Sequence, residues 1–407
     1  MTDAATSSPA QGGDALPLSE LTTLRVGGPA ARMVTATTED ELVALARETW
    51  EAGGPWLALG GGSNLLVGDD GVPGTVIRVA TTGIATRAGG EPNTVHLRVQ
   101  AGERWDDLVA YTVSRGWSGI EALSGIPGSV GAAPVQNIGA YGQELVSVLV
   151  AIDFLEEDAD APRRMTADEL ELGYRTSVLK QGLRGIVTAV ELELHDTAPE
   201  RDVLGGALGV PIAYAQLANA LGVQLGDRVP VEQVRSAVLA LRASKGMVLD
   251  PDDHDSWSAG SFFTNPIVTE HVARTMPSDA PRWYVEPETP PEVVPLTGLD
   301  ESPLDQFLAH QAEAEASAAE PDAAEPAGEV QVKLSAAWLI EHSGIHRGFA
   351  LPGSHAAVSS RHTLALTNRG GASADELVQL ARFVRSRVQA EFGILLEPEP
   401  VLVGTEL

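Results

Sequence analysis

Two glycine-rich segments in the first half of the chain are the clearest chemical signal in the sequence. The first is Gly60-Gly61-Gly62-Ser63-Asn64, and the second spans residues 119–142. Glycines let backbone N–H groups approach a phosphate with no Cβ in the way, and serine and asparagine side chains add hydrogen-bonding groups. Either loop alone is equally consistent with an ordinary tight turn, and two unrelated surface turns remain an alternative. Together, the two loops favour a long ligand that carries a pyrophosphate, a sugar and a planar ring.

The residues around the loops narrow the kind of cofactor. The first loop is not the G-x-G-x-x-G fingerprint of nicotinamide dinucleotides, because an apolar strand at 65–67 follows it where a helix is required. In the second segment, Gln136 and Asn137 could supply amide contacts to the edge of a flavin ring. The chain has no cysteine, which excludes disulfides, thiolate nucleophiles and cysteine-bound clusters. A redox protein of this composition needs a bound organic cofactor.

Length, charge and hydropathy exclude several classes of protein. The chain has 407 residues, which suffice for two or three domains. Its formal net charge of −29 and the lack of a basic cluster argue against a nucleic-acid-binding protein. No apolar run approaches the roughly 18–20 residues of a membrane span, and the first residues lack the pattern of a secretory signal. We therefore expect a soluble, cytoplasmic protein that binds neither nucleic acid nor membrane.

Apolar periodicity and capping patterns predict the elements that position the two loops. Capping boxes followed by terminal glycines predict two helices, one from Thr38 (with Glu41) to Gly53 and one from Ser373 (with Glu376) to Gly393. Further helices are predicted from Trp105 and over residues 231–244. Strands are predicted at 31–37, 55–59, 65–67, 75–80, 95–100, 146–155, 185–194 and 394–403.

These elements predict several domains and one unusual insertion. We expect a disordered N-terminus (1–15), a first subdomain (16–84), a second subdomain (85–200) and a C-terminal domain (201–407). Within the last, residues 286–329 contain 12 acidic residues, 7 prolines and no lysine or arginine. Such a stretch cannot bury enough apolar surface to offset the entropy of ordering it. We interpret it as a mobile surface insertion with a short helix at 303–318, and an acidic docking segment for a partner is the alternative.

Eight short motifs occur in a fixed order between residues 20 and 404. They are Thr23–Gly28, Gly60–Asn64, Gly125–Ala132, Gln136–Gly142, Tyr174–Ser177, Gly260–Pro266, Lys333–Ile340 and Leu396–Glu399. This set resembles the family of UDP-N-acetylenolpyruvoylglucosamine reductases. The resemblance implies an α+β fold, in which two subdomains clasp FAD in the manner of the vanillyl-alcohol-oxidase type and a C-terminal α/β domain binds the substrate.

The resemblance also implies a reaction of peptidoglycan precursor synthesis. NADPH reduces FAD, and hydride then passes to the enolpyruvyl ether of UDP-N-acetylglucosamine, which gives UDP-N-acetylmuramate. The family's catalytic positions correspond to Arg175, Ser261 and Glu399. A guanidinium suits the negative charge that hydride transfer leaves on the substrate, Ser261 is the proton donor, and a buried, protonated Glu399 could donate a hydrogen bond to the enolate. Without the resemblance, Arg175 would be interpreted as half of an exposed ion pair and Ser261 as the start of a strand.

The same resemblance implies binding residues for the cofactor and the substrate. FAD would be bound by Gly60, Gly61, Gly62, Ser63, Asn64, Gly125, Ile126, Pro127, Gly128, Ser129, Gly131, Ala132, Gln136, Asn137, Gly139, Ala140 and Tyr141. The nucleotide-sugar substrate would contact Tyr214, Lys245 and Asn265, with Lys245 supplying positive charge for the diphosphate. Tyr214 indicates the form of the family with a tyrosine-bearing substrate loop, although a core tyrosine and a surface lysine are the plain alternatives. We expect no metal site and a monomer.

Two features depart from the family pattern, and two rival functions remain. Gly246–Ser258 carries extra acidic residues, and Pro400 follows Glu399 where an aliphatic residue is usual, which bears on the strand pairing there. One rival is another FAD-dependent oxidoreductase of the same fold acting on a hydroxy acid or sugar, but such enzymes lack the segment 260–266. The other is a catalytically inactive nucleotide-sugar-binding or regulatory protein, which would be expected to have lost one of the three catalytic positions.

Overall fold

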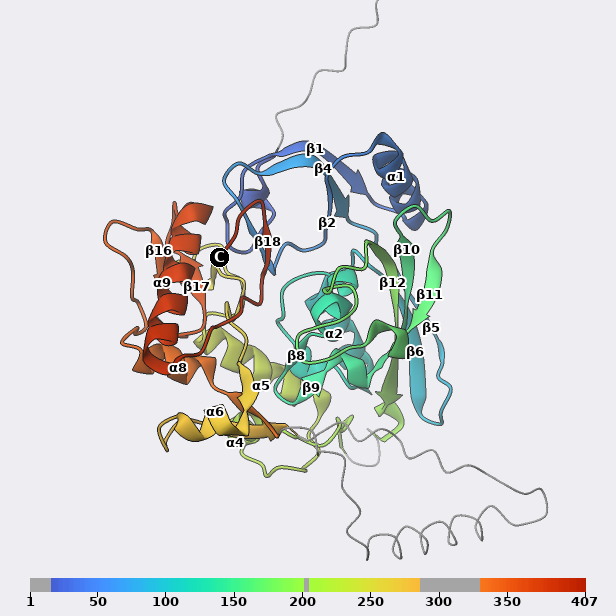
Figure 1. Cartoon of the computed structure of the whole chain (residues 1–407). Helices are drawn as coiled ribbons and strands as arrows, with labels where there is room; N and C mark the ends of the chain where they lie inside the picture. The colour runs from blue at the N-terminus through green and yellow to red at the C-terminus, as the bar shows by residue number, and fades with distance from the viewer. Residues whose placement is uncertain (1–15, 201–204, 286–329) are drawn as a thin grey trace, which may run out of the picture.

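A three-stranded parallel sheet carries the first glycine loop. In the computed structural model, which describes residues 16–200, 205–285 and 330–407, its strands are β1 (Ala30–Ala36), β4 (Val72–Val79) and β2 (Trp56–Leu59), in the order β1-β4-β2. Helix α1 (Glu39–Ala52) connects β1 to β2 and packs on this sheet (Figure 1). Thr38 Oγ1 accepts the Glu41 N–H at 3.2 Å at its start, and Gly53, at φ 72°, ends it. The loop at 60–64 follows β2 directly.

A larger antiparallel sheet forms the second layer. Its strands, in the order β11-β10-β12-β6-β5, are β11 (Arg163–Thr166), β10 (Leu149–Glu156), β12 (Gly185–Asp196), β6 (Thr94–Gln100) and β5 (Ile84–Ala88), and β7 (Trp117–Ser118) pairs with β12. Helix α2 (Trp105–Arg115) packs into the same core, where the buried Trp105 donates from Nε1 to Leu123 O at 3.1 Å. The second glycine-rich segment, 119–142, follows α2 and contains the short 3₁₀ helix Val130–Gln136 and the small strand β8 (Gly139–Ala140), which pairs with β9 (Gln143–Glu144) just after the segment.

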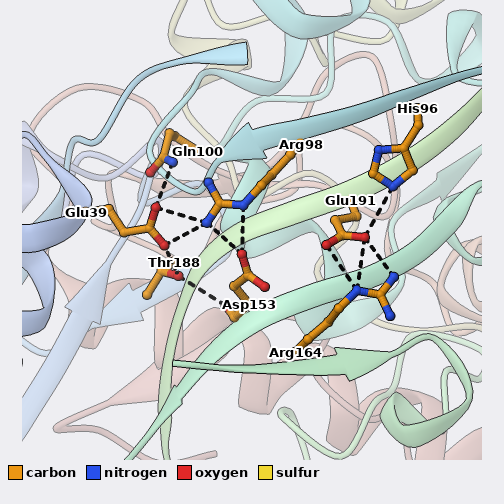
Figure 2. Close-up of polar contacts among 8 residues, drawn as sticks. All are labelled: Glu39, His96, Arg98, Gln100, Asp153, Arg164, Thr188 and Glu191. Carbon is orange, nitrogen blue, oxygen red and sulfur yellow. Dashed lines mark hydrogen bonds and ion pairs between the residues drawn. The ribbon is translucent and has the colours of Figure 1, made fainter. Parts of the chain in front are cut away.

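A network of charged side chains fastens α1 to the second sheet (Figure 2). Arg98 on β6 donates from Nη2 to Glu39 Oε1 at 2.8 Å, and from Nε to Asp153 Oδ2 on β10 at 2.8 Å. Glu39 is the first residue of α1, where a carboxylate also interacts favourably with the helix dipole. Nearby, Glu191 accepts hydrogen bonds from Arg164 and contacts the ring of His96 at 3.2 Å. The Arg98–Glu39 pair therefore joins α1, which packs on the first sheet, to the second sheet, and the Glu191 contacts join strands within the second sheet.

The C-terminal half contributes to two further hydrophobic cores and then returns to the first sheet region. One core is formed mainly by residues 212–238 and the other mainly by residues 262–396, joined by Leu24, Val26 and Leu66. Its elements are α4 (Ala215–Leu221), α5 (Val231–Ser244), β13 (Ile267–Thr269), α6 (Glu270–Thr275), β14 (Arg282–Val285), β15 (Gln331–Leu334), α8 (Ala336–His342), β16 (Ala356–Val358), β17 (Leu366–Asn368) and α9 (Ala374–Phe392). The strands β13, β15 and β14 pair antiparallel, as do β16 and β17. The last strand, β18 (Val401–Val403), pairs in parallel with β3 (Leu65–Val67), so the C-terminus lies beside the first glycine loop (Figure 1).

Most of the sequence-predicted elements are confirmed, and one is wrong. Helix α9 begins with a complete capping box between Ser373 and Glu376 and ends at Gly393. The predicted strand 394–403 is wrong, since only Val401–Val403 is a strand. Pro398 and Pro400 have no N–H to give a ladder. The predicted helix at 303–318 and the N-terminus 1–15 lie outside the described residues. The predicted boundary after residue 84 falls at the start of β5, a strand that the sequence analysis missed.

None of the helices in the described ranges combines the length and apolarity that crossing a bilayer requires.

Candidate active site

A cavity of about 640 Å³ lies where the two glycine loops face the C-terminal half. This volume is typical of a small-molecule or cofactor site. Fourteen of the residues named above for FAD line it: Gly60, Gly61, Gly62, Ser63, Asn64, Ile126, Pro127, Gly128, Ser129, Ala132, Gln136, Gly139, Ala140 and Tyr141. Arg175, Ser261, Glu399, Tyr214 and Lys245 line it as well. Gly125, Gly131, Asn137 and Asn265 do not.

The two glycine loops pack directly against each other. A Cβ on Gly61 would lie 2.5 Å from the Cα of Gly128, and a Cβ on Gly128 would lie 2.6 Å from Ser63 Oγ. A Cβ on Gly60 would collide with Ser129 Oγ. Glycine is therefore required here for loop-to-loop contact, a reason different from the approach to a phosphate that the sequence suggested. The two loops thus form one continuous surface of backbone that borders the cavity, which we call the glycine cradle (residues 60–64 and 125–142).

Polar side chains at the cradle form hydrogen bonds with other groups of the protein itself. Asn64 donates from Nδ2 to Gln136 Oε1 at 2.5 Å, which links the first loop to the second. Asn137 is buried behind the wall, where it donates to Gly173 O and accepts from Val146 N. Its amide is therefore taken up by main chain, and only Gln136 of the amide pair borders the cavity.

Arg175 and Glu399 form an ion pair in the cavity wall. Arg175 Nε lies 3.3 Å from Glu399 Oε1, and both side chains are less than one-fifth exposed. Arg175 also donates to Asn137 O at 3.3 Å and to Gly139 O at 2.7 Å, so its guanidinium has one orientation. Arg175 adopts φ 56° and Tyr141 φ 51°, left-handed conformations that cost about 1–3 kcal/mol each and concentrate at functional sites. Burial raises the pKa of Glu399, against the opposing effect of Arg175 and Lys180.

Main-chain hydrogen bonds bring Ser261 next to Glu399. The rings of Phe262 and Phe263 are buried in the C-terminal core, which anchors this segment. Glu399 N donates to Phe262 O at 2.9 Å, and Phe263 forms an isolated antiparallel bridge with Pro398. Ser261 therefore precedes the residue that binds the Glu399 main chain. Among the described residues, its hydroxyl has no hydrogen-bond partner and borders the cavity.

Of the three residues expected to bind substrate, Tyr214 and Lys245 line the cavity and Asn265 does not. Lys245 donates to Gln216 Oε1 at 2.9 Å and lies over the ring of Tyr141, whose edge contacts Tyr214. Burial and the nearby Arg242 lower the pKa of Lys245. Asn265 lies elsewhere, because its Oδ1 accepts the N–H of Ala336, the first residue of α8.

Three basic side chains among the described cavity residues were missed by the sequence analysis: Lys180, Arg242 and His362. Arg242 is a charge on the buried face of α5, in register with Val234 and Val238, and that break in the apolar pattern was a usable signal. Burial, together with the charges of Lys245 and Arg347, lowers the pKa of His362 to about 4. Its ring is therefore neutral at pH 7. Nothing in the local sequence marks Lys180 or His362.

The lining of the cavity suits a ligand that carries a pyrophosphate. The glycines of the cradle bring main chain without Cβ atoms to one wall of the cavity. Beside it, Arg242 is almost fully buried and donates from Nη2 to Met247 O, while its Nε has no partner among the described residues. A buried guanidinium with an unused donor is suited to an anionic group. The residues present are therefore compatible with FAD.

Comparisons with known proteins agree with this geometry. A family model described as UDP-N-acetylenolpyruvoylglucosamine reductase, C-terminal domain, matches residues 250–403, and one described as FAD binding domain matches residues 30–160. The UDP-N-acetylenolpyruvoylglucosamine reductase of Leifsonia xyli subsp. xyli is 57% identical over 390 residues, which cover 96% of this chain and 98% of the relative. That of Saccharopolyspora erythraea is 45% identical and covers 97% and 96%.

A solved structure supports the same assignment. The crystal structure of the UDP-N-acetylenolpyruvylglucosamine reductase from Thermus caldophilus is 26% identical, with a TM-score of 0.56, and the match covers 96% of this chain and 98% of that one. The FAD-binding model and the C-terminal model match successive parts of the chain, and the relatives match it over nearly its full length. The chain belongs to the family of UDP-N-acetylenolpyruvoylglucosamine reductases.

Proposed function

We propose that this chain reduces the enolpyruvyl ether of UDP-N-acetylglucosamine to UDP-N-acetylmuramate, as a cytoplasmic monomer that uses NADPH. The observation that carries the proposal is the pairing of Arg175 with a largely buried Glu399 in a cavity bounded by the glycine cradle. Ser261 lies close by, and its hydroxyl has no hydrogen-bond partner in the part of the chain that the structure describes. Bound FAD would take hydride from NADPH and deliver it to the enolpyruvyl double bond. The cradle and Arg242 would hold the dinucleotide.

Arg175 is positioned to stabilise the charge that hydride addition creates. Hydride at the methylene carbon leaves negative charge on the adjacent carbon and on the carboxylate. Two carbonyl oxygens fix the guanidinium of Arg175, so little reorganisation is needed when that charge develops. Tyr214 and Lys245 line the same cavity, where Lys245 would attract the substrate diphosphate.

Ser261 and Glu399 would complete the reduction. The Ser261 hydroxyl would give its proton to the carbanionic carbon, a step that needs a very basic acceptor because serine is a weak acid. Glu399, whose burial favours the protonated form, would donate a hydrogen bond to the enolate oxygen. The other candidate function, oxidation of a hydroxy acid or sugar, has no observation in its favour here.

Paired substitutions test these roles. In a single turnover of NADPH-reduced enzyme with the enolpyruvyl substrate, S261A and E399Q should each react about 10²–10⁴-fold more slowly, the usual contribution of a positioned acid. E397Q is the matched control, because Glu397 lies two residues away, is exposed, and pairs with Arg385 at 3.3 Å. Wild-type rates in S261A and E399Q would refute the assigned roles.

A further inference from the structure

The main chain of Glu399 is held by side chains from two distant segments. Its carbonyl accepts hydrogen bonds from Asn64 Nδ2 at 3.2 Å and from Lys180 Nζ at 3.2 Å. On either side, Glu399 N donates to Phe262 O at 2.9 Å, and Val401 N donates to Asn64 O at 2.9 Å. The first glycine loop, the segment after Arg175 and the C-terminal segment therefore meet at this one carbonyl.

Lys180 differs from Asn64 because it also brings a charge into the cavity wall. Its half-buried side chain lines the cavity. Burial and the nearby Arg175 lower the pKa of Lys180, whereas Glu399 acts in the opposite direction. Since Asn64 already supplies a hydrogen bond to the carbonyl, and burying a charge costs free energy, satisfying the carbonyl does not account for an ammonium at this point.

The carboxyl of Glu399 is the group that this charge affects. Among the described residues, the charged groups that act on it are Arg175, at 3.3 Å, and Lys180. Burial raises the pKa of Glu399, and both cations oppose this rise. Removing the charge of Lys180 should therefore let the carboxyl keep its proton to a higher pH.

We propose that Lys180 is a positioning residue of the reaction, which fixes the main chain of Glu399 and limits how tightly its carboxyl holds a proton. The proposal rests on the function given above, in which Glu399 acts as a hydrogen-bond donor to the enolate. A group that shares a proton with a reaction intermediate works best when its pKa lies near the working pH. A cation that offsets the effect of burial serves that requirement.

Two substitutions separate the charge from the hydrogen bond. K180Q keeps a donor without the charge, and K180R keeps the charge. The infrared carbonyl band of the protonated carboxyl, assigned as the band that E399Q removes, is followed against pH in each variant. In K180Q the band should persist to a pH about one unit higher, the lower end of the effect of one nearby charge. In K180R it should titrate as in the wild type. K180M, which has neither donor nor charge, should show the same shift of the band as K180Q. It takes the place of K180Q in the experiment if K180Q does not fold.

The kinetic constants of the same variants are the second measurement. In K180Q, kcat should fall about 10–100-fold, because a Glu399 whose pKa has moved away from the working pH is a less effective proton-sharing group. KM should be nearly unchanged, and the alkaline limb of the kcat profile should be displaced together with the infrared band. K180R should recover most of kcat. Identical infrared titrations in the wild type, K180Q and K180M would overturn the proposal. If E399Q reacts at the wild-type rate, the role of Glu399 fails, and the infrared shift alone then decides whether Lys180 sets its protonation.

Discussion

Replacing Gly61 with alanine should separate the two glycine loops and weaken FAD binding. The new methyl group would lie 2.5 Å from the Cα of Gly128 and 2.8 Å from its carbonyl carbon. Carbon atoms in contact are normally about 3.5–4.0 Å apart. The loops must therefore open by about 1 Å, and both colliding atoms belong to main chain, so no side chain can turn away to make room.

The magnitude follows from the cost of overpacking. Forcing a methyl group into a packed contact costs about 1–3 kcal/mol, which corresponds to about 5–150-fold in an equilibrium constant. Without cofactor the loops can part and absorb part of this cost. Because FAD requires the closed cradle, most of the cost should appear as weaker binding, measured by titrating apoprotein with FAD and following flavin fluorescence.

A matched control separates this effect from the loss of a glycine in general. An alanine Cβ at Gly90 would make only an ordinary contact of 3.7 Å, with a flexible side chain. G90A should therefore bind FAD and unfold as the wild type does. If G61A also shows an unchanged Kd for FAD and an unchanged Tm, the packing argument for the two loops is refuted.

Three further predictions concern the elements around the cavity. R98M should lower the free energy of unfolding, measured in urea, by about 1–2 kcal/mol. This is less than the cost of breaking a fully buried ion pair, because the Arg98 site is partly exposed. A loss below about 0.3 kcal/mol, the usual detection limit, would contradict the role given to this network. Burial acts to raise the pKa of Asp106, but hydrogen bonds from Arg235 and Gly125 N outweigh it and hold the pKa below the usual 3.8. The stability that this carboxylate contributes is therefore present above pH 3.8, the pKa of the unfolded chain, and is lost as the pH falls through the lower pKa of the folded protein. The difference in unfolding free energy between wild type and D106N should accordingly shrink between pH 6 and pH 3, and a difference that grows on acidification would show that the sign is wrong. R175K keeps the charge but not the fork that two carbonyls fix, so kcat should fall about 10²-fold, and steady-state kinetics with an unchanged kcat would show that the fixed orientation is unimportant.

Local patterns predicted the elements well because their causes are local. The capping box at Ser373 and Glu376 and the glycine at 393 set both ends of α9 without help from the rest of the chain. The predicted strand at 394–403 failed because Pro398 and Pro400 have no N–H to give a ladder. The pairing that forms there joins Glu399 N to Phe262 O, a partner far away in sequence that no periodicity reveals.

The candidate site was predictable where a motif carries it and not where packing makes it. The glycine segments indicated a shared ligand, but nothing in them showed that Gly61 and Gly128 touch. Arg242 interrupts the apolar face of α5 and could have been found from that interruption. Lys180 reaches the site only because the C-terminal segment folds back beside the first loop.

The most direct test of the proposed function is an anaerobic titration of the FAD-loaded protein followed by its visible flavin absorbance. NADPH should bleach the flavin band, and one equivalent of enolpyruvyl-UDP-N-acetylglucosamine should restore it with formation of UDP-N-acetylmuramate. Bleaching without recovery on addition of that substrate would contradict the proposed reaction while leaving the flavin-binding fold in place.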